Sequence, residues 1–386
     1  MNPLPKADSK NMRVIGHNDL GGKGDGSQIS IVDDYAYIGH MSMNDVGTSV
    51  VDISDPTAPR LVTQIKRPPH TMSHKTQILG DLLLVNHQRS RFDPGEDGSW
   101  SAGMAIYDIS ERHDPKQIGF YDAPGIGIHR TGVDGDRYAF VSRTDDGFIG
   151  RFLAIIDLID PTKPTEVGRF WLPGQHVAAG EEPSWDPSVR NVKLHHGLPT
   201  GDRLYCGWGD GGFVSVDISD KTSPQLVSHL DFGAESSDTH TALKVPGRDL
   251  VLVVDEVLKK TIGQRRDVRV VDVSDEKNPQ VIAVLPPPSD SDLQSGARFG
   301  PHNLHEMRPG TFISSDVFYL TYFAGGLRVY DVSDAHNPKE IAWCVPDAPL
   351  GRDGIEINDV VVTEKRLVYI TDRHVGGLYV IQHEGQ

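Results

Sequence analysis

Cysteine is nearly absent from this chain, whose 386 residues include only Cys206 and Cys344. Each lies in an apolar, strand-like stretch, so we expect two buried free thiols and no disulfide. No stretch approaches the roughly 18 consecutive apolar residues of a membrane-spanning helix, and the N-terminal segment lacks the apolar core of a signal peptide. These absences predict a cytoplasmic protein with no membrane partner.

Positive charge is also scarce. The chain has 54 acidic and 38 basic residues, for a formal net charge of −16. Phosphate backbones and anionic lipid surfaces repel such a chain. We therefore expect neither nucleic acid nor membrane as a partner.

Several common catalytic motifs are missing. The sequence has no GxSxG elbow and no Cys-x-x-Cys pair, which excludes the common serine hydrolase and thiol routes. The glycine-rich run at residues 21–26 is not followed by a helical pattern, so it is no phosphate-binding loop.

What the chain has instead is one short phrase repeated six times: an apolar run, an Asp and a Ser/Asp/Pro turn. The first Asp of each phrase is Asp52, Asp108, Asp157, Asp217, Asp272 and Asp331. The intervals of 49 to 60 residues exceed the roughly 40–45 residues of a bare four-stranded propeller blade. The repeats therefore predict blades that carry insertions.

Between the phrases, short runs with apolar alternation are bounded by Gly, Asp and Pro, which indicates strands. A seventh unit near the C-terminus supplies only three strands, and the N-terminal segment 12–20 is well placed to supply the fourth. Such closure removes open sheet edges. The sequence thus predicts an all-β fold: a single domain over residues 1–386, forming a seven-bladed β-propeller of four-stranded antiparallel blades, with the last blade closed by the N-terminal strand.

The repeated phrases resemble those of LVIVD-repeat proteins, which are predicted bacterial propellers. The resemblance covers nearly the whole chain and implies the propeller fold. It implies no particular chemistry, because one fold hosts many functions.

The long insertions are expected to lie on one face of the propeller. They are the loops between second and third strands (residues 88–101, 143–151 and 256–267) and the connections between blades (173–191 and 286–301). Long loops on a rigid scaffold are where binding sites usually lie. We therefore expect these segments to cover a small-molecule substrate.

Five blades carry a histidine near the start of the innermost strand: His74, His129, His195, His240 and His305. Four stand nine or ten residues before the next strand, and His305 fits with a longer turn; Asn358 takes this position in the seventh blade. Inner strands line the axis, so these imidazoles should converge into a metal site. Lys75 and Arg130 directly follow ring histidines, and strand alternation should turn them away from the axis.

In architecture and histidine placement only, this arrangement is similar to carotenoid-cleavage oxygenases, which hold iron with four inner-strand histidines. It is also similar to the selenium-binding/methanethiol oxidase family, whose metal is copper. The expected cofactor is a divalent transition metal, with iron or copper favoured and zinc or manganese as further options.

Other polar residues are candidates for catalysis at the same face. They are His87, Arg143, Glu256 and His374 at the ends of second strands, and His302 just upstream of the ring. Arginine can bind an anionic group, and His or Glu can move protons. The leading hypothesis is an iron or copper oxidoreductase acting on a small organic substrate, aromatic or anionic. A metal-assisted lyase or hydrolase and a non-catalytic interaction propeller are the alternatives, and the sequence leaves the oligomeric state open.

Overall fold

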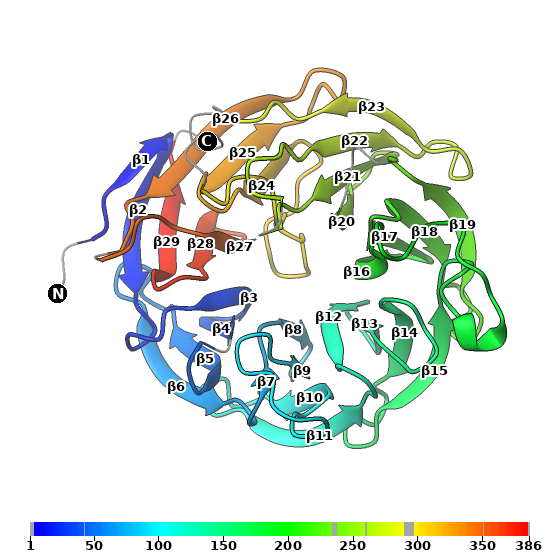
Figure 1. Ribbon diagram of the computed structural model, residues 1–386. Coiled ribbons are helices and arrows are strands. Elements are labelled where there is room, and N and C mark those ends of the chain that lie inside the picture. Colours follow the sequence, from blue (N-terminus) through cyan, green and yellow to red (C-terminus); the bar gives the residue numbers. More distant parts are fainter. Residues whose placement is uncertain are drawn as a thin grey trace.

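Four-stranded antiparallel sheets recur along the chain, one for each repeat, and they surround a common axis (Figure 1). The computed structural model describes residues 4–41, 43–233, 238–258, 261–288, 297–349 and 351–384. No α-helix occurs in these ranges, and a short 3₁₀ turn spans Val177–Ala179. The all-β prediction is therefore confirmed.

The first four blades follow in chain order. Blade 1 contains β3 (Gly26–Val32), β4 (Tyr35–His40), β5 (Val46–Asp52) and β6 (Arg60–Lys66). Blade 2 contains β7 (Thr71–Met72), β8 (Thr76–Leu79), β9 (Leu82–Arg89), β10 (Gly103–Asp108) and β11 (Lys116–Asp122). Blade 3 contains β12 (Ile128–Val133), β13 (Tyr138–Arg143), β14 (Phe152–Asp157) and β15 (Thr165–Phe170). Blade 4 contains β16 (Val192–Thr200), β17 (Arg203–Gly209), β18 (Phe213–Asp217) and β19 (Gln225–Leu230).

The remaining blades complete the ring. Blade 5 contains β20 (Thr239–Lys244), β21 (Leu250–Asp255), β22 (Val268–Asp272) and β23 (Gln280–Val284), and one residue pair, Gly209↔Thr239, joins it to blade 4. Blade 6 contains β24 (Val317–Thr321), β25 (Leu327–Asp331) and β26 (Lys339–Pro346), and its inner segment pairs through a single bridge, Leu304↔Leu320. Blade 7 contains β27 (Ile357–Val362), β28 (Leu367–Asp372) and β29 (Gly377–His383).

The N-terminal segment closes the ring from outside. β2 (Met12–Asn18) pairs with β29 as the fourth strand of blade 7, as predicted. β1 (Ala7–Lys10) pairs with β26 and adds an outer strand to blade 6, which the sequence did not indicate. In Figure 1 both blue N-terminal strands lie beside the orange and red C-terminal ones. These pairings cover the outer edges of two blades, which would otherwise be open to other chains.

The repeated Asp of each phrase serves the turn that follows it. In all six phrases its carboxylate accepts a hydrogen bond from the backbone N–H two residues later, at 2.8–2.9 Å. This is the Asx turn that Asp favours. Apolar side chains fill the spaces between blades; Leu84 and Ile106 of blade 2, for example, pack with Val141 and Phe152 of blade 3. The phrases therefore specify the fold.

A buried Asp–His–Ser chain in blade 1 is structural. His40 Nδ1 lies 2.6 Å from Asp25 Oδ1, and His40 Nε2 lies 2.8 Å from Ser49 Oγ. All three side chains are at most 2% exposed, and the Gln64 amide also donates to Ser49 Oγ. Since no substrate reaches this hydroxyl, the chain stabilises blade 1 and provides no nucleophile.

Candidate metal centre

The innermost strands are irregular where the candidate ligands stand. Each carries extra residues relative to its partner strand: His129 in blade 3, residues 193–195 in blade 4, His240 in blade 5 and Asn358 in blade 7. In blade 2 the break between β7 and β8 spans residues 73–75. Such β-bulges re-aim side chains and are frequent beside functional sites. Here they direct the side chains toward the axis.

Five imidazoles meet on the axis, and four of them are predicted ring members. Ring centroids lie 5.3 Å apart for His74 and His129, 4.6 Å for His129 and His195, and 3.7 Å for His195 and His240. The fifth is His302, whose ring lies 4.5 Å from that of His240. All five residues are between 1% and 8% exposed.

His305 does not join this cluster, which corrects the sequence-based ring. Its Nε2 lies 2.8 Å from the backbone oxygen of Phe312, and its Nδ1 accepts a hydrogen bond from the Val362 N–H. His305 lines a separate cavity toward the opposite face. The sequence placed His305 in the ring by its distance from the following strand. That placement was wrong because the turn in blade 6 (residues 306–316) is far longer than the turn in blade 3 (134–137).

Backbone oxygens at Nδ1 fix the tautomers of two cluster histidines, and the Gln88 amide, in the orientation of the structure, sets that of a third. His195 Nδ1 lies 3.1 Å from the His240 backbone oxygen, and His302 Nδ1 lies 2.6 Å from the Asn358 backbone oxygen. His129 Nδ1 lies 2.9 Å from Gln88 Oε1. These oxygens only accept, so each Nδ1 carries the proton and each Nε2 presents a lone pair. Metal-ligating histidines are commonly held in this way.

His129 and His195 have their Nε2 atoms 2.9 Å apart. With both protons on Nδ1, two lone pairs face each other across this short distance, which is unfavourable unless a cation lies beside both. His240 adds a buried Nε2 with no hydrogen-bond partner in the described chain. The donor set therefore fits a bound metal ion.

His74 differs from the other four. The Asn86 side chain is oriented by the Lys75 N–H, which donates to its Oδ1, and its amide nitrogen lies 3.3 Å from His74 Nδ1. His74 Nδ1 thus accepts, and the neutral ring carries its proton on Nε2, an atom without a partner among the described residues. His74 can donate a hydrogen bond into the site and is poorly prepared to bind a metal.

The cluster histidines are held in their neutral form. The pKa of each of the five lies well below 6.5, first because of burial and then because of neighbouring histidines and cations. Neutral imidazole is the form that binds metals.

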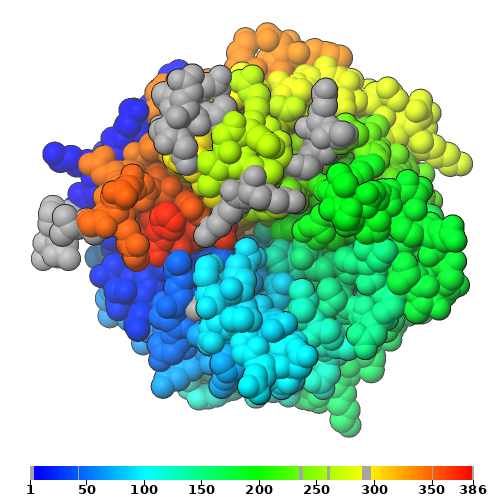
Figure 2. All heavy atoms as spheres, in the orientation of Figure 1, coloured from blue at the N-terminus to red at the C-terminus, as the bar shows by residue number. Residues whose placement is uncertain are grey.

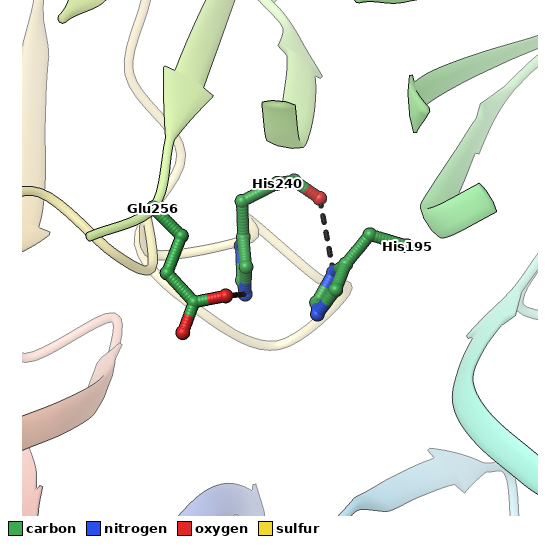
Figure 3. Close-up of side chains that lie close together, drawn as sticks. All are labelled: His195, His240 and Glu256. Carbon is green, nitrogen blue, oxygen red and sulfur yellow. Dashed lines mark hydrogen bonds and ion pairs between the residues drawn. The ribbon is translucent and has the colours of Figure 1, made fainter. Parts of the chain in front are cut away.

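Glu256 brings a carboxylate to the cluster. Ligand atoms of His195, His240 and Glu256 lie within 4.8 Å of one another, and Figure 3 shows the three side chains converging from β16, β20 and the end of β21. Glu256 Oε1 lies 2.7 Å from Arg298 Nη2 and 3.6 Å from His302 Nε2. The described residues thus contain a His/Glu group that can hold a metal.

Three of the five residues predicted to act in catalysis line the same chamber: Glu256, His302 and His374. His374 pairs with Glu356 at 3.2 Å, which raises the pKa of the imidazole. Burial alone would raise the pKa of Glu356, but His374, Arg373 and Arg298 lower it to about 2. The two side chains therefore form a charged pair at the rim.

His87 and Arg143 lie outside the chamber, contrary to the prediction. His87 Nδ1 lies 2.8 Å from Ser101 Oγ, its ring packs on Phe120 of β11, and burial lowers its pKa to about 4. Arg143 is paired with Asp145 at 2.7 Å and lies 3.4 Å from Glu166 of β15. Both side chains turn toward the outer strand of their own blade, so neither contacts the site.

The chamber has a volume of about 370 Å³. Four of the five predicted insertions contribute to its lining, through Arg91, Arg151, Glu256 and Arg298. Residues 173–191 do not line it, because Gln175 ties this segment to the Ile149 and Arg151 backbones. Figure 2 shows light-blue and yellow-green segments reaching over the middle of the ring.

Lys75 also lines the chamber, although alternation predicted that it would turn away. The break after β7 interrupts alternation, so His74 and Lys75 reach the same space. Sequence reasoning missed Arg151 and Lys193 as chamber residues. Burial lowers the pKa of Arg151 to about 10, and burial together with Arg151 lowers that of Lys193 to about 8. In the sequence, Lys193 stands two residues before the ring histidine His195, and this spacing was the available indication that Lys193 reaches the chamber.

Two further predictions can be compared with the structure. Cys206 and Cys344 are buried free thiols, as predicted. None of the helical segments in the described chain is long and apolar enough to cross a bilayer.

Comparisons with known proteins support the fold. Residues 23–66, 133–171 and 200–231 match the family model described as LVIVD repeat, and no curated protein matches the sequence. A hypothetical selenium-binding protein from Sulfolobus tokodaii is 13% identical over 95% of this chain and 92% of its own, with a TM-score of 0.62. The β-propeller domain of Cps50 (Swd1) from Myceliophteria thermophila is 12% identical over 97% and 100%, with a TM-score of 0.61. The chain is thus a β-propeller that contains LVIVD repeats.

Proposed function

We propose that this propeller is a metal-dependent enzyme, an iron or copper oxidoreductase that acts on a small organic substrate. The ion would be held by His129, His195, His240 and His302, with the Glu256 carboxylate within reach. This ligand set replaces the five-histidine ring predicted from the sequence: His302 takes the place of His305, and His74 becomes a hydrogen-bond donor.

One observation carries the proposal: the 2.9 Å approach of the His129 and His195 Nε2 atoms. Their Nδ1 protons are committed to Gln88 and to the His240 carbonyl. With the Gln88 amide in this orientation, a proton shared between the two rings would relieve the contact only by forming a buried imidazolium, which burial disfavours. A metal ion relieves it and also uses the unpartnered Nε2 of His240.

The donor chemistry favours iron or copper. Imidazole ligands suit both metals, and a neutral ligand set leaves the ion its full positive charge. Such an ion supplies one-electron and O₂ chemistry, which ordinary side chains do not.

The surrounding side chains have separate tasks. His74 presents an Nε2 proton that can hydrogen-bond the substrate. Arg298 fixes Glu256 at 2.7 Å and so keeps this carboxylate beside His240 and His302. The His374–Glu356 pair at the rim can exchange a proton with solvent. The overlying loops limit the entry of water.

The selenium-binding protein of similar fold is consistent with a functional centre on a propeller of this type, although the likeness at 13% identity concerns the fold alone. A chamber with a few convergent polar groups and perturbed titratable residues also favours an enzyme over an interaction scaffold.

Metal analysis of protein purified without a histidine tag tests the proposal. We expect near-stoichiometric iron or copper, lost in His195→Ala but retained in His113→Ala, which removes an exposed histidine on an outer turn. Circular dichroism confirms folding, and oxygen uptake with candidate substrates tests turnover. Zinc or manganese lost in the same way would favour the lyase or hydrolase alternative. Absence of any metal after reconstitution would refute the metalloenzyme.

A further inference from the structure

We propose that the chamber binds a small organic dianion, a molecule carrying two carboxylate groups on an apolar body. The inference rests on the proposed function only in treating this molecule as the substrate. The binding itself follows from the charges of the chamber.

The chamber is positively charged in a strongly acidic protein. Six cationic side chains line it: Lys75, Arg91, Arg151, Lys193, Arg298 and Arg373. Three carboxylates accompany them: Asp238, Glu256 and Glu356. With the cluster histidines neutral, these nine groups leave an excess of three positive charges, to which the charged His374 at the rim adds a fourth, against a net charge of −16 for the whole chain.

Two of the six cations already have partners. Arg298 Nη2 lies 2.7 Å from Glu256 and its Nη1 lies 3.3 Å from Glu356. Arg373 Nε lies 3.7 Å from Glu356. These pairs use the carboxylates on one side of the chamber and fix Glu256 beside the cluster.

The other four cations lack such partners. In the described chain, the charged groups of Lys75, Arg91 and Lys193 make no hydrogen bond or ion pair, and Arg151 uses only its Nε, toward Ser142 and Leu194. Lys75 is 5% exposed and Arg151 is 9% exposed. A buried cation without a partner is costly. A bound anion would remove this cost.

The buried cations enter the chamber from several blades. Lys75 belongs to blade 2, whereas Arg151 and Lys193 belong to blades 3 and 4, and Arg151 Nε lies 3.1 Å from the backbone oxygen of Leu194, the residue after Lys193. Arg91 is exposed, and its positive charge acts on Arg151. A monoanion would offset only one of the excess positive charges, so a ligand with two carboxylates fits the chamber better.

The remaining lining and the size restrict the rest of the ligand. Met41, Met43, Phe92 and Leu258 add apolar surface to the chamber lining. A volume of about 370 Å³ lies at the small end of the roughly 300–1,000 Å³ range for ligand sites. A compact dicarboxylate with an apolar body fits both restrictions.

Calorimetric titration of metal-free protein at low salt tests the inference without relying on the metal. The probes are benzene-1,3-dicarboxylate and benzoate, which differ by one carboxylate. We expect the dicarboxylate to bind at least tenfold more tightly. Lys75→Met and Lys193→Gln should each remove most of this preference, whereas Lys163→Gln, which changes an exposed lysine in the blade 3 turn, should not.

Thermal unfolding separates a binding role from a structural one. Without ligand, Lys75→Met and Lys193→Gln should melt at or above the wild-type temperature, because each removes an unpartnered cation. They should also lose the stabilisation that the dicarboxylate gives to the wild type. Equal affinity for the two probes, or variants that melt lower and bind normally, would overturn the inference. Dicarboxylate binding by a chain that never takes up metal would refute the proposed enzyme alone, whereas metal uptake without dicarboxylate binding would refute this inference alone.

Discussion

The two ends of the propeller axis carry charged side chains in opposite arrangements. Toward the opposite face, Arg130 Nη2 lies 2.7 Å from Glu306 Oε1, and Arg308 Nε lies 2.9 Å from Glu306 Oε2. Asp359 is also buried there; burial raises its pKa to about 6, and the positive charge of Arg130 opposes that rise. On the loop-covered face, four cations lack a carboxylate partner, and two of them, Lys75 and Arg151, are buried. Charges that neutralise one another stabilise a fold, whereas charges left unpaired in a closed space indicate a ligand.

Residues close together in the sequence separate the two regions. His129 belongs to the cluster, while Arg130 pairs with Glu306 on the opposite side; His302 belongs to the cluster, while His305 lines the opposite cavity. In blade 3 the division occurs within one strand, where the bulge sets which side chain turns which way. In blade 6 it occurs within the inner segment that precedes β24.

Breaking the ion pairs that Glu306 makes with Arg130 and Arg308 should have the largest effect on stability. Glu306→Gln leaves Arg130 and Arg308 without their shared carboxylate, and breaking a buried ion pair costs about 3–5 kcal/mol. We expect the free energy of unfolding, measured by denaturant titration, to fall by that amount. The control is Glu364→Gln, at an exposed position that lines the same cavity as Glu306 and His305. A loss below about 1 kcal/mol would show that these ion pairs are not a stabilising network.

The two histidines of blade 6 should differ in metal binding. His302→Gln removes a proposed ligand, so we expect bound metal to fall from near one ion per chain to below about a tenth. His305→Gln should retain the metal, because this ring contacts Phe312 and Val362 instead. Mass spectrometry of both variants, each checked for folding, gives the comparison. Loss in His305→Gln with retention in His302→Gln would restore the ring predicted from the sequence.

A substitution outside the ligand set should weaken the centre through the backbone. A Cβ on Gly207 of β17 would lie 2.5 Å from the backbone carbon of His240, so Gly207→Ala must displace the bulge that aims this ring. Changes that disturb ligand orientation commonly cost about 10–100-fold in metal affinity. Competition with a chelator measures the change, with Gly354→Ala as a control in open space. Unchanged affinity would show that the bulge is not rigid.

The smallest effect concerns the repeated turns, far from both axial regions. Hydrogen bonds from Ser110, Ser219 and Ser274 hold the pKa values of Asp108, Asp217 and Asp272 below 3.8. A lowered folded-state pKa gives stability that is present above the unfolded value and is lost as the pH falls through the folded one. Below pH 4, the melting temperature of the triple Asp→Asn variant should therefore fall less than that of the wild type. Parallel curves between pH 7 and 3 would contradict this.

The sequence predicted the features that depend on repetition. The six phrases indicated the blades, and a constant spacing identified His74, His129, His195 and His240. The sequence did not reveal features that depend on local irregularity. A long turn misplaced His305, and bulges brought Lys75 into the chamber against strand alternation. The tautomers of His74 and His195 also needed coordinates, because they depend on which backbone or amide group faces each Nδ1.

The bulge at the start of each inner strand has a consequence for how such a centre can change. In blade 7 the bulged residue is Asn358, which binds Ser27 of blade 1 through its side chain and His302 through its carbonyl. Each blade with such a bulge thus offers one axial position whose side chain is set independently of strand pairing. Exchanging a single residue there changes which side chain reaches the axis and leaves the sheets intact, so the donor set of the proposed centre can change one blade at a time.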